Sequence, residues 1–459
     1  MTSPENSTSP AETPHRTDPD ETPSRLRWRR PLLALLAGAA LVTTVTVLTR
    51  DAQRPEPVAD TRSTPASQQG ALLQSVHSLQ GRLRRLPEDT AGWASLGSAY
   101  VELARVSADP TYYGKAQDAL NRSLALRPEG NGPAMLGMGS LANARHDFAA
   151  ARDWALRAEV VAPGSAEVQG VLADALTQLG DDSAATAAVQ RMLDLRPGVA
   201  AFSRASYHFE LHGRDTDARD AMERALGAAA TPDEIAFCRY YLGELAFNSG
   251  RLDEAAEHYE QGIAVAAQDV TLLQGRAKAA AARGDLPRAL EEYRQVVQRA
   301  PLPQYLTEYG ELLDAAGRGP EAARQYALIT QQHRLLETQG ATDDLSAALF
   351  LADHGDKAEA LRRAEAEWGR RRSVFVADAL AWALHVNGRS AEALPLAEQA
   401  ASLGWRNATM AYHRGMILAG LGRADEAAGF LAEALRINPQ FSALHAPIAT
   451  QVLGELRSR

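Results

Sequence analysis

The sequence predicts an all-α protein, a solenoid built from helical hairpins. Glycines recur at a nearly fixed step of 33 to 38 residues, and each ends an apolar-periodic segment that an alanine-rich segment follows. Residues that favour strands are sparse in the body of the chain, where Ala, Leu, Glu and Arg dominate. A period near 34 residues, with helix, turn and helix in each unit, is typical of such solenoids. The recurring glycines are Gly180, Gly213, Gly250, Gly284, Gly317, Gly355, Gly388 and Gly422.

The chain is expected to begin with a disordered cytoplasmic tail over residues 1–30 that ends in a basic segment. Residues 1–24 carry almost no apolar side chains, so they cannot bury enough surface to offset chain entropy. Arginines cluster just before an uncharged run at residues 31–49. Nineteen helical residues rise about 28 Å, close to the thickness of a bilayer core. We therefore expect residues 31–49 to be a transmembrane helix that acts as a signal anchor.

The charges that flank this span favour a cytoplasmic N-terminus. Four arginines lie within six residues before the span, and those after it are more dispersed. This pattern predicts a single-pass plasma-membrane protein whose solenoid is extracytoplasmic. The inverted topology stays open, as does a cleaved signal peptide with its site at residues 37–39, which would leave a secreted solenoid. The uncleaved anchor is favoured because the apolar run continues about ten residues past that site.

Order is expected from residue 71 onward. Residues 50–70 are rich in Pro, Ser, Thr and Gln, which predicts a flexible linker. Apolar residues at three- and four-residue steps then predict an amphipathic helix, a half-repeat that covers the end of the stack. The solenoid is expected over residues 71–447, followed by a C-terminal tail at 448–459. The apolar residues of the first helix are Leu73, Val76, Leu79, Leu83 and Leu86.

The units also agree at positions other than the glycine. The first helix pairs a large residue with a small one, as in Leu242-Gly243. The second carries Ala with a large residue four positions later, as in Ala255 and Tyr259. The small residue lets the second helix approach closely, and the large residues fill the space between hairpins.

This pattern resembles the tetratricopeptide repeat family, in about ten units that cover roughly residues 71–447. The whole arrangement resembles membrane-anchored tetratricopeptide proteins of high-GC bacteria. The resemblance implies an α-solenoid of about ten tetratricopeptide hairpins, here preceded by one transmembrane helix and a disordered tail. It implies a protein partner but no assigned activity. The chain departs from the repeat pattern of the family at three places. These are an insertion at residues 105–111, His146 where Gly is usual, and a second helix in the seventh unit that runs to about Thr338.

Composition and motifs argue against several other function classes. The net charge of −9 disfavours a general nucleic-acid binder, which needs clustered Lys and Arg. Cys238 is the only cysteine, so neither an intramolecular disulfide nor a thiolate metal cluster can form. Phosphate-binding loops, nucleophile elbows and zinc-protease motifs are absent from the sequence. We therefore expect no catalysis, no cofactor, no metal and no small-molecule substrate.

Two histidines could bind a metal ion, and two short runs of like charge interrupt the repeats. His208 and His212 lie one helical turn apart and could chelate a divalent ion, but the sequence shows no third ligand, so a structural or surface role is expected. Residues 343–344 (Asp-Asp) and 370–372 (Arg-Arg-Arg) are expected to be solvated charge at turns.

The resemblance implies that a partner binds the inner face formed by the first helices. The family's best-understood peptide sites clamp a carboxylate with Lys and Asn. At the matching positions only Lys278 is cationic, so acidic tails are not expected to bind. The inner face instead mixes acidic and aromatic residues, which favours a partner segment with Arg or Lys beside apolar anchors. The alternative is that several of the aromatics belong to the repeat core. The residues expected to bind the partner are Tyr207, Tyr240, Glu244, Glu311, Asp378, Trp382 and Tyr412.

These features predict a membrane-anchored scaffold that docks a protein or peptide partner outside the cytoplasm. The alternative is a structural accessory subunit of an envelope enzyme or transporter complex.

Overall fold

The computed structural model describes residues 68–341 and 343–458, in which helices and turns occur but no strand. The chain forms two units, Met1–Leu32 and Leu33–Arg459, and every described residue belongs to the second. The expected tail, the transmembrane helix at 31–49 and the linker up to residue 67 lie outside the described residues. None of the described helices combines the length and apolar character that a membrane span requires.

Twenty of the described helices pair into ten hairpins, which confirms the predicted number of repeats. The first helices of the hairpins are α2 Thr90–Ser107, α4 Gly132–Ala144, α6 Ala166–Leu179, α8 Val199–Leu211, α10 Pro232–Asn248, α12 Val270–Ala282, α14 Pro303–Ala315, α16 Asp344–His354, α18 Val374–Val386 and α20 Ala408–Gly420. The second helices are α3 Tyr112–Leu126, α5 Phe148–Val161, α7 Asp182–Leu195, α9 Asp215–Ala228, α11 Leu252–Val265, α13 Leu286–Arg299, α15 Gly319–Thr338, α17 Lys357–Arg370, α19 Ser390–Ala400 and α21 Ala424–Ile437. The end helices are α1 Gln68–Arg85 and α22 His445–Arg457.

The close approach of paired helices depends on the small residue that the sequence places on each first helix. In the fifth hairpin a Cβ at Gly243 would lie closer than 3.0 Å to the ring of Tyr259, which is fully buried. The side chain that the pattern places on α11 thus occupies the space that the missing Cβ leaves on α10. Any larger residue at position 243 would push the two helices apart.

The turns within the hairpins follow the predicted glycine pattern with one exception. Seven of the eight recurring glycines have positive φ, but Gly355 has φ −139° and an extended conformation. His146, which replaces the usual glycine, adopts φ 62°. A non-glycine residue in this left-handed region costs about 1 to 2 kcal/mol, so contacts around His146 must hold it there.

The helices at the two ends of the solenoid and the insertion at 105–111 have other bounds than the sequence predicted. Helix α1 begins at Gln68, inside the expected linker. The insertion at 105–111 extends α2 to Ser107, and Ala108 ends that helix in a left-handed conformation. Residues 448–457, expected as a tail, belong to α22, whose Leu453 is buried against the preceding repeats.

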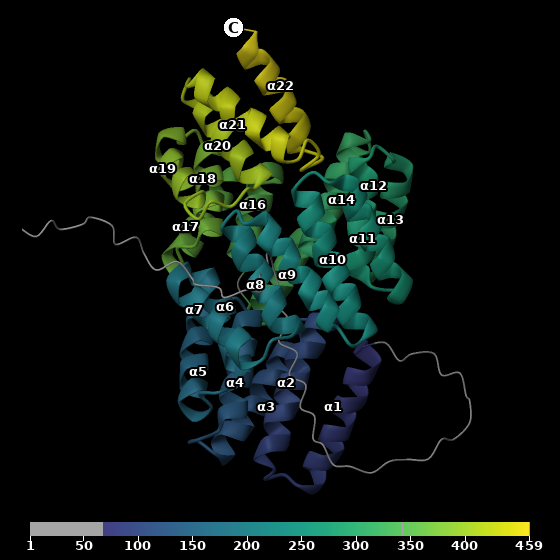
Figure 1. Ribbon diagram of the computed structural model, residues 1–459, viewed down its shortest axis with the longest axis vertical. Helices are drawn as coiled ribbons and strands as arrows, with labels where there is room; N and C mark the ends of the chain where they lie inside the picture. The colour runs from purple at the N-terminus through teal and green to yellow at the C-terminus, as the bar shows by residue number, and fades with distance from the viewer. Residues whose placement is uncertain (1–67, 342, 459) are drawn as a thin grey trace, which may run out of the picture. The chain divides into compact units, whose positions relative to one another are not determined.

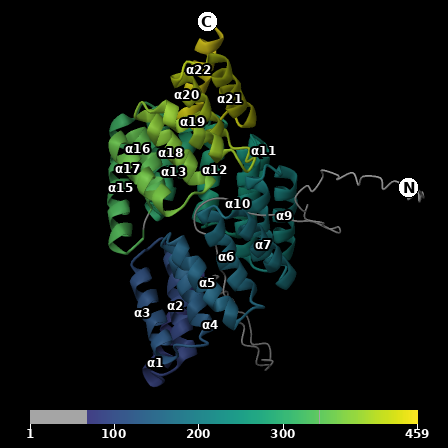
Figure 2. The same ribbon diagram turned by 90° about the vertical axis from the view of Figure 1, so that its left-hand side faces the viewer.

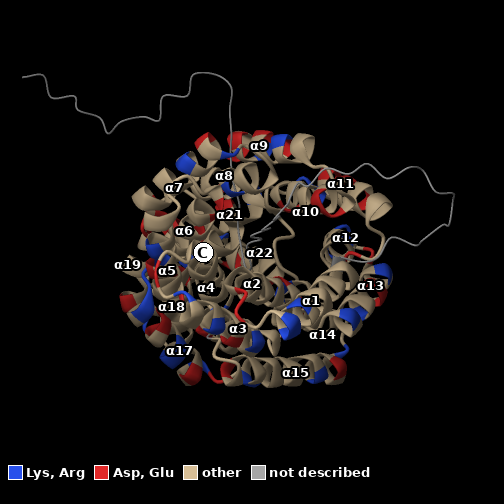
Figure 3. Cartoon of the chain, turned by 90° about the horizontal axis from the view of Figure 1, so that it is seen from below, with Lys and Arg blue, Asp and Glu red and all other residues tan. Residues whose placement is uncertain are grey.

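The hairpins of this unit stack so that the first helices lie inside and the second helices outside. Seen from below, α4, α6, α8, α10, α12 and α14 lie nearer the centre than the helices that follow each of them (Figure 3). The last repeats, yellow-green to yellow, lie above the first ones, purple to blue (Figures 1 and 2). The stack therefore winds past a full turn, which brings residues about 190 positions apart into contact.

We call these contacts the interturn seam. Each of its four contacts joins a residue at or near the turn inside one hairpin to a residue of a loop that connects two hairpins one superhelical turn later. Asn438 is fully buried and its side-chain amide donates to the Phe247 carbonyl at 2.8 Å. Arg406 pairs with Asp215 at 2.6 Å between Nη1 and Oδ2. Repeats far apart in the chain thus hold one another in place. The four pairs of the seam are His146 with Asp343, Gln178 with Arg371, Asp215 with Arg406, and Phe247 with Asn438.

Arg371 departs from the expectation of a solvated turn. It is 6% exposed, its guanidinium pairs with Glu367, and it donates to the side chain of Gln178. Its guanidinium also stacks 4.7 Å from the ring centre of Phe148. The middle arginine of the triplet is therefore a structural residue of the seam.

Glu210 makes the seam region sensitive to pH. It is 7% exposed on α8 and accepts hydrogen bonds from Asn248 and from Trp405, which belongs to the next turn. Burial raises the pKa of Glu210 to about 7, and the charges of Asp215 and Glu244 add to that rise. The folded protein therefore binds a proton that the unfolded chain releases near pH 4.5.

Stability should accordingly fall as pH rises through 7. Between pH 5.5 and 8 this carboxyl alone removes about 2 kcal/mol of unfolding free energy. Glu210→Gln should flatten that dependence, which urea denaturation of both proteins at several pH values measures. Parallel curves for wild type and variant would show that Glu210 is ionised throughout.

Candidate functional site

The inner wall formed by α10, α12 and α14 carries a ladder of polar side chains at equivalent repeat positions. Tyr240, Gln274 and Glu308 are spaced 34 residues apart. The Tyr240 hydroxyl lies 3.5 Å from Gln274 Oε1, and Gln274 Nε2 donates to Glu308 at 2.6 Å. The ladder connects three successive repeats and leaves Tyr240 and Glu308 partly exposed. Gln274 and Glu308 were not among the predicted site residues, although the 34-residue spacing from Tyr240 points to them.

A second row lies one helical turn further along the same helices. Glu244 accepts from the Tyr259 hydroxyl at 2.6 Å and pairs with Lys278 Nζ at 2.6 Å. Both charged side chains keep about a fifth of their surface exposed, at 20% for Glu244 and 17% for Lys278. Burial raises the pKa of Tyr259 well above its ordinary value, so the hydroxyl stays protonated and remains a donor.

Glu311 extends the wall towards the eighth repeat. Its Oε1 lies 3.0 Å from Nε2 of His354, and 13% of its side-chain surface remains exposed. The ring of His354 stacks on Tyr326 at 4.5 Å between ring centres. The predicted residues Tyr240, Glu244 and Glu311 therefore share one partly accessible wall, and each already has a partner within the protein.

The other four predicted residues are buried. Asp378, Trp382 and Tyr412 are 6%, 5% and 2% exposed, and they pack around His413, whose ring stacks on Trp382 at 4.2 Å. A partner would have to displace these neighbours to reach them. Tyr207 is 4% exposed and stacks on Phe375 from the next turn at 6.0 Å.

The wall stays acidic after its internal pairing. The wall carries the carboxyl groups of Glu244, Glu308 and Glu311, and one lysine, Lys278, whose Nζ contacts Glu244. Glu311 lies against His354. Burial raises the pKa of Glu308, which weakens its contribution to the charge. Even without Glu308, the two carboxylates of Glu244 and Glu311 outnumber the single ammonium group of Lys278.

A groove of about 430 Å³ lies elsewhere, where α11, α12 and α13 meet. Its arginines are already paired: Arg276 with Glu292 at 3.1 Å, and Arg283 with Asp253 at 3.1 Å. A hollow whose charges are internally matched offers little to a charged ligand, so the inner wall is the stronger candidate.

The thiol of Cys238 is unsuited to covalent chemistry. It is fully buried on α10, and burial raises the pKa of the thiol to about 12. The thiol form therefore dominates at neutral pH.

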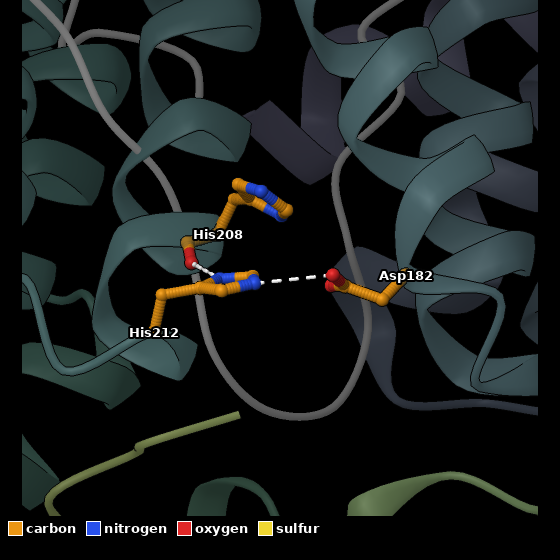
Figure 4. Close-up of side chains that lie close together, drawn as sticks. All are labelled: Asp182, His208 and His212. Atoms are coloured by element: carbon orange, nitrogen blue, oxygen red, sulfur yellow. Dashed lines mark hydrogen bonds and ion pairs between the residues drawn. The ribbon is translucent and has the colours of Figure 1, made fainter. Parts of the chain in front are cut away.

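A separate cluster joins the two histidines that the sequence singled out to a carboxylate. Asp182 opens α7, His208 lies in the last turn of α8 and His212 follows that helix. Figure 4 shows the three side chains facing one another, with His212 Nε2 lying 3.1 Å from Asp182 Oδ2. One ligand atom from each residue lies within 4.8 Å of the other two. Asp182 supplies the third group that sequence reasoning missed, because it comes from the preceding repeat.

Comparison with known proteins agrees with the repeat pattern. A tetratricopeptide repeat profile matches residues 136–200, 212–270, 275–333 and 379–440, and no curated protein matches the chain. Among solved structures, a tetratricopeptide repeat protein from Parabacteroides merdae ATCC 43184 is 19% identical, with 55% of this chain and 96% of that chain covered and a TM-score of 0.34. The Cut9–Hcn1 hetero-tetramer of the APC/C is 15% identical (84% and 81% covered, TM-score 0.41). The human IFIT1 dimer with PPP-AAAA is 13% identical (80% and 87%, TM-score 0.43).

Proposed function

Since the chain belongs to the tetratricopeptide repeat family, whose members generally bind protein partners, we propose that it is a membrane-anchored scaffold. Residues 31–49 are its anchor, the solenoid lies on the extracytoplasmic side, and the chain contributes no catalysis. The apolar run and the arginines before it support the anchor and its orientation.

The acidic inner wall is the observation that carries the docking proposal. Tyr240 and Glu244 of the fifth hairpin and Glu311 of the seventh are partly accessible there. An extended segment with Arg or Lys would bind the carboxylates, and its apolar side chains would pack on Tyr240. The existing partners Lys278 and His354 hold the carboxylates in place before a ligand arrives, which lowers the entropy cost of binding.

Glu244→Gln combined with Glu311→Gln should weaken capture of the partner. Each exchange removes one charge from a partly exposed site, worth about 0.5 to 1 kcal/mol, so affinity should fall about tenfold. The measurement is crosslinking on intact cells with a membrane-impermeant reagent, followed by mass spectrometry and by binding of a matching synthetic peptide.

Glu223→Gln is the matched control, because Glu223 is exposed on α9 outside the inner wall. It removes the same charge and should leave capture unchanged. Equal capture by all three proteins would exclude the inner wall as the docking site. Capture only by a membrane-permeant reagent would contradict the extracytoplasmic placement and support the inverted topology.

The outer face of α5 favours a second candidate, a structural accessory subunit of an envelope complex. Leu156, Val160 and Val161 are 46%, 85% and 40% exposed there. Permanent interfaces are more apolar than transient ones. Crosslinks that map to α5 and survive the two Glu→Gln exchanges would favour this candidate over docking at the inner wall.

A further inference from the structure

The hydrogen bonds around Asp182, His208 and His212 decide where the protons of the two histidines lie. The Thr186 hydroxyl donates to the Asp182 carbonyl at 2.8 Å, so it can only accept from His208 Nε2, which lies 2.9 Å away. His208 Nε2 therefore carries the proton and Nδ1 keeps its lone pair. His212 Nδ1 faces the His208 carbonyl, which only accepts, so the lone pair of neutral His212 is on Nε2.

With both histidines neutral, none of the three groups offers a donor to the others, and one ligand atom from each lies within 4.8 Å of the other two. His212 Nε2 and Asp182 Oδ2 lie 3.1 Å apart, a distance at which two lone pairs repel unless a proton or a cation lies between them. In metal sites, the ring nitrogen that does not bind the metal usually donates a hydrogen bond to another group, which fixes the histidine in the tautomer that coordinates. His208 Nε2 and His212 Nδ1 are placed to make such bonds, to a hydroxyl and a carbonyl respectively.

We propose that Asp182, His208 and His212 form a binding site for a divalent transition-metal ion, with Zn²⁺ as the best fit. Tetrahedral zinc with N and O ligands at 2.0 to 2.1 Å places the ligand atoms about 3.3 Å apart. The 3.1 Å separation between His212 Nε2 and Asp182 Oδ2 is close to that value, and a ligand atom of His208 lies within 4.8 Å of the other two residues' ligand atoms. Two imidazoles and one carboxylate leave a fourth position for water.

The surroundings permit an ion to enter and leave. The side chains of His212 and Asp182 are 25% and 38% exposed. Arg214 is a cation that acts on both histidines, but its guanidinium pairs with Asp217 at 2.6 Å.

Bound metal would connect two repeats beside the interturn seam. Asp182 belongs to the third hairpin, while His208 and His212 belong to the fourth. His212 directly precedes Gly213, the corner that touches Gly404 one turn later. The ion would therefore stiffen a corner that holds the two turns together.

The test is calorimetric titration of the full-length, metal-free protein with Zn²⁺ in excess Mg²⁺, with Co²⁺ absorbance to report coordination. We expect one equivalent of Zn²⁺ per chain, a rise in thermal midpoint, and intense visible Co²⁺ bands. Asp182→Asn, His208→Gln and His212→Gln should each weaken binding at least tenfold. His258→Gln, a half-buried histidine on α11 that faces Arg239, should leave binding unchanged.

Two outcomes would overturn the site. One is a wild-type chain that takes up no stoichiometric Zn²⁺; the other is retention of full affinity by Asp182→Asn. This variant changes a side chain that is 38% exposed, so it remains a valid test if a histidine variant fails to fold. Binding that persists in all three ligand variants but disappears in His258→Gln would place the ion elsewhere.

Discussion

Gly213→Ala should lower the unfolding free energy of the solenoid by about 2 to 5 kcal/mol. Gly213 has φ +64°, where an L side chain costs about 1 to 2 kcal/mol. A Cβ there would also lie closer than 3.0 Å to the backbone oxygen of Gly404, which belongs to the next turn and cannot rotate away. Separating the two turns adds an overpacking cost of about 1 to 3 kcal/mol.

Gly284→Ala is the matched control. Gly284 occupies the same repeat position with φ +84°, but a Cβ there would meet nothing within 4 Å. This variant should lower the unfolding free energy only by the cost of the left-handed conformation, about 1 to 2 kcal/mol. The difference between the two variants therefore isolates the seam contact from the glycine requirement of the turn.

Urea denaturation followed by circular dichroism measures both losses, and hydrogen exchange of the α19–α20 connection shows where the damage lies. Gly213→Ala should increase exchange in that connection, where Gly404 lies 191 residues away in the sequence, whereas Gly284→Ala should not. Equal losses for both variants, with no change in exchange near Gly404, would show that the turns do not hold each other in solution.

The sequence predicted the hairpins because their signals are local. Turn glycines, the small residue on each first helix and the large residue on each second helix act within about 34 residues, and the structure confirms them at Gly243 and Tyr259. The seam could not be predicted in this way. Which corners meet depends on small rotations between repeats that accumulate over a whole turn. Arg371 was therefore expected in solvent and is buried.

The candidate site also combines features that the sequence could predict with features that depend on how distant helices pack. The repeat register, aligned with the tetratricopeptide family that it resembles, predicted Tyr240, Glu244 and Glu311 on the inner face, and they are partly accessible. Register could not show that the end of the stack buries Tyr412, because this depends on where α22 packs, and Tyr412 stacks on His445 of that helix at 4.7 Å. Asp182 was missed because the pairing of α7 with α8 brings it to the histidines from another repeat.

Arg204→Met should lower the unfolding free energy by about 3 to 5 kcal/mol. Arg204 is 3% exposed on α8, and its Nε and Nη2 each donate to Asp174 of α6 at 2.7 Å. Methionine fills much of the same volume but leaves the Asp174 carboxylate buried without its cation. Removing one partner of a buried ion pair is far more costly than the net value of the pair.

The double variant Asp174→Leu with Arg204→Met should recover most of that loss. It removes both charges, so the desolvation cost of each disappears together with their attraction, and well-packed apolar side chains take their place. Urea denaturation of wild type, both single variants and the double variant gives the coupling energy between the two positions. A double variant no more stable than Arg204→Met would show that packing around the guanidinium stem matters more than charge. Glu433→Gln, in the exposed pair with Arg436, should leave the midpoint unchanged, because solvent already screens that contact.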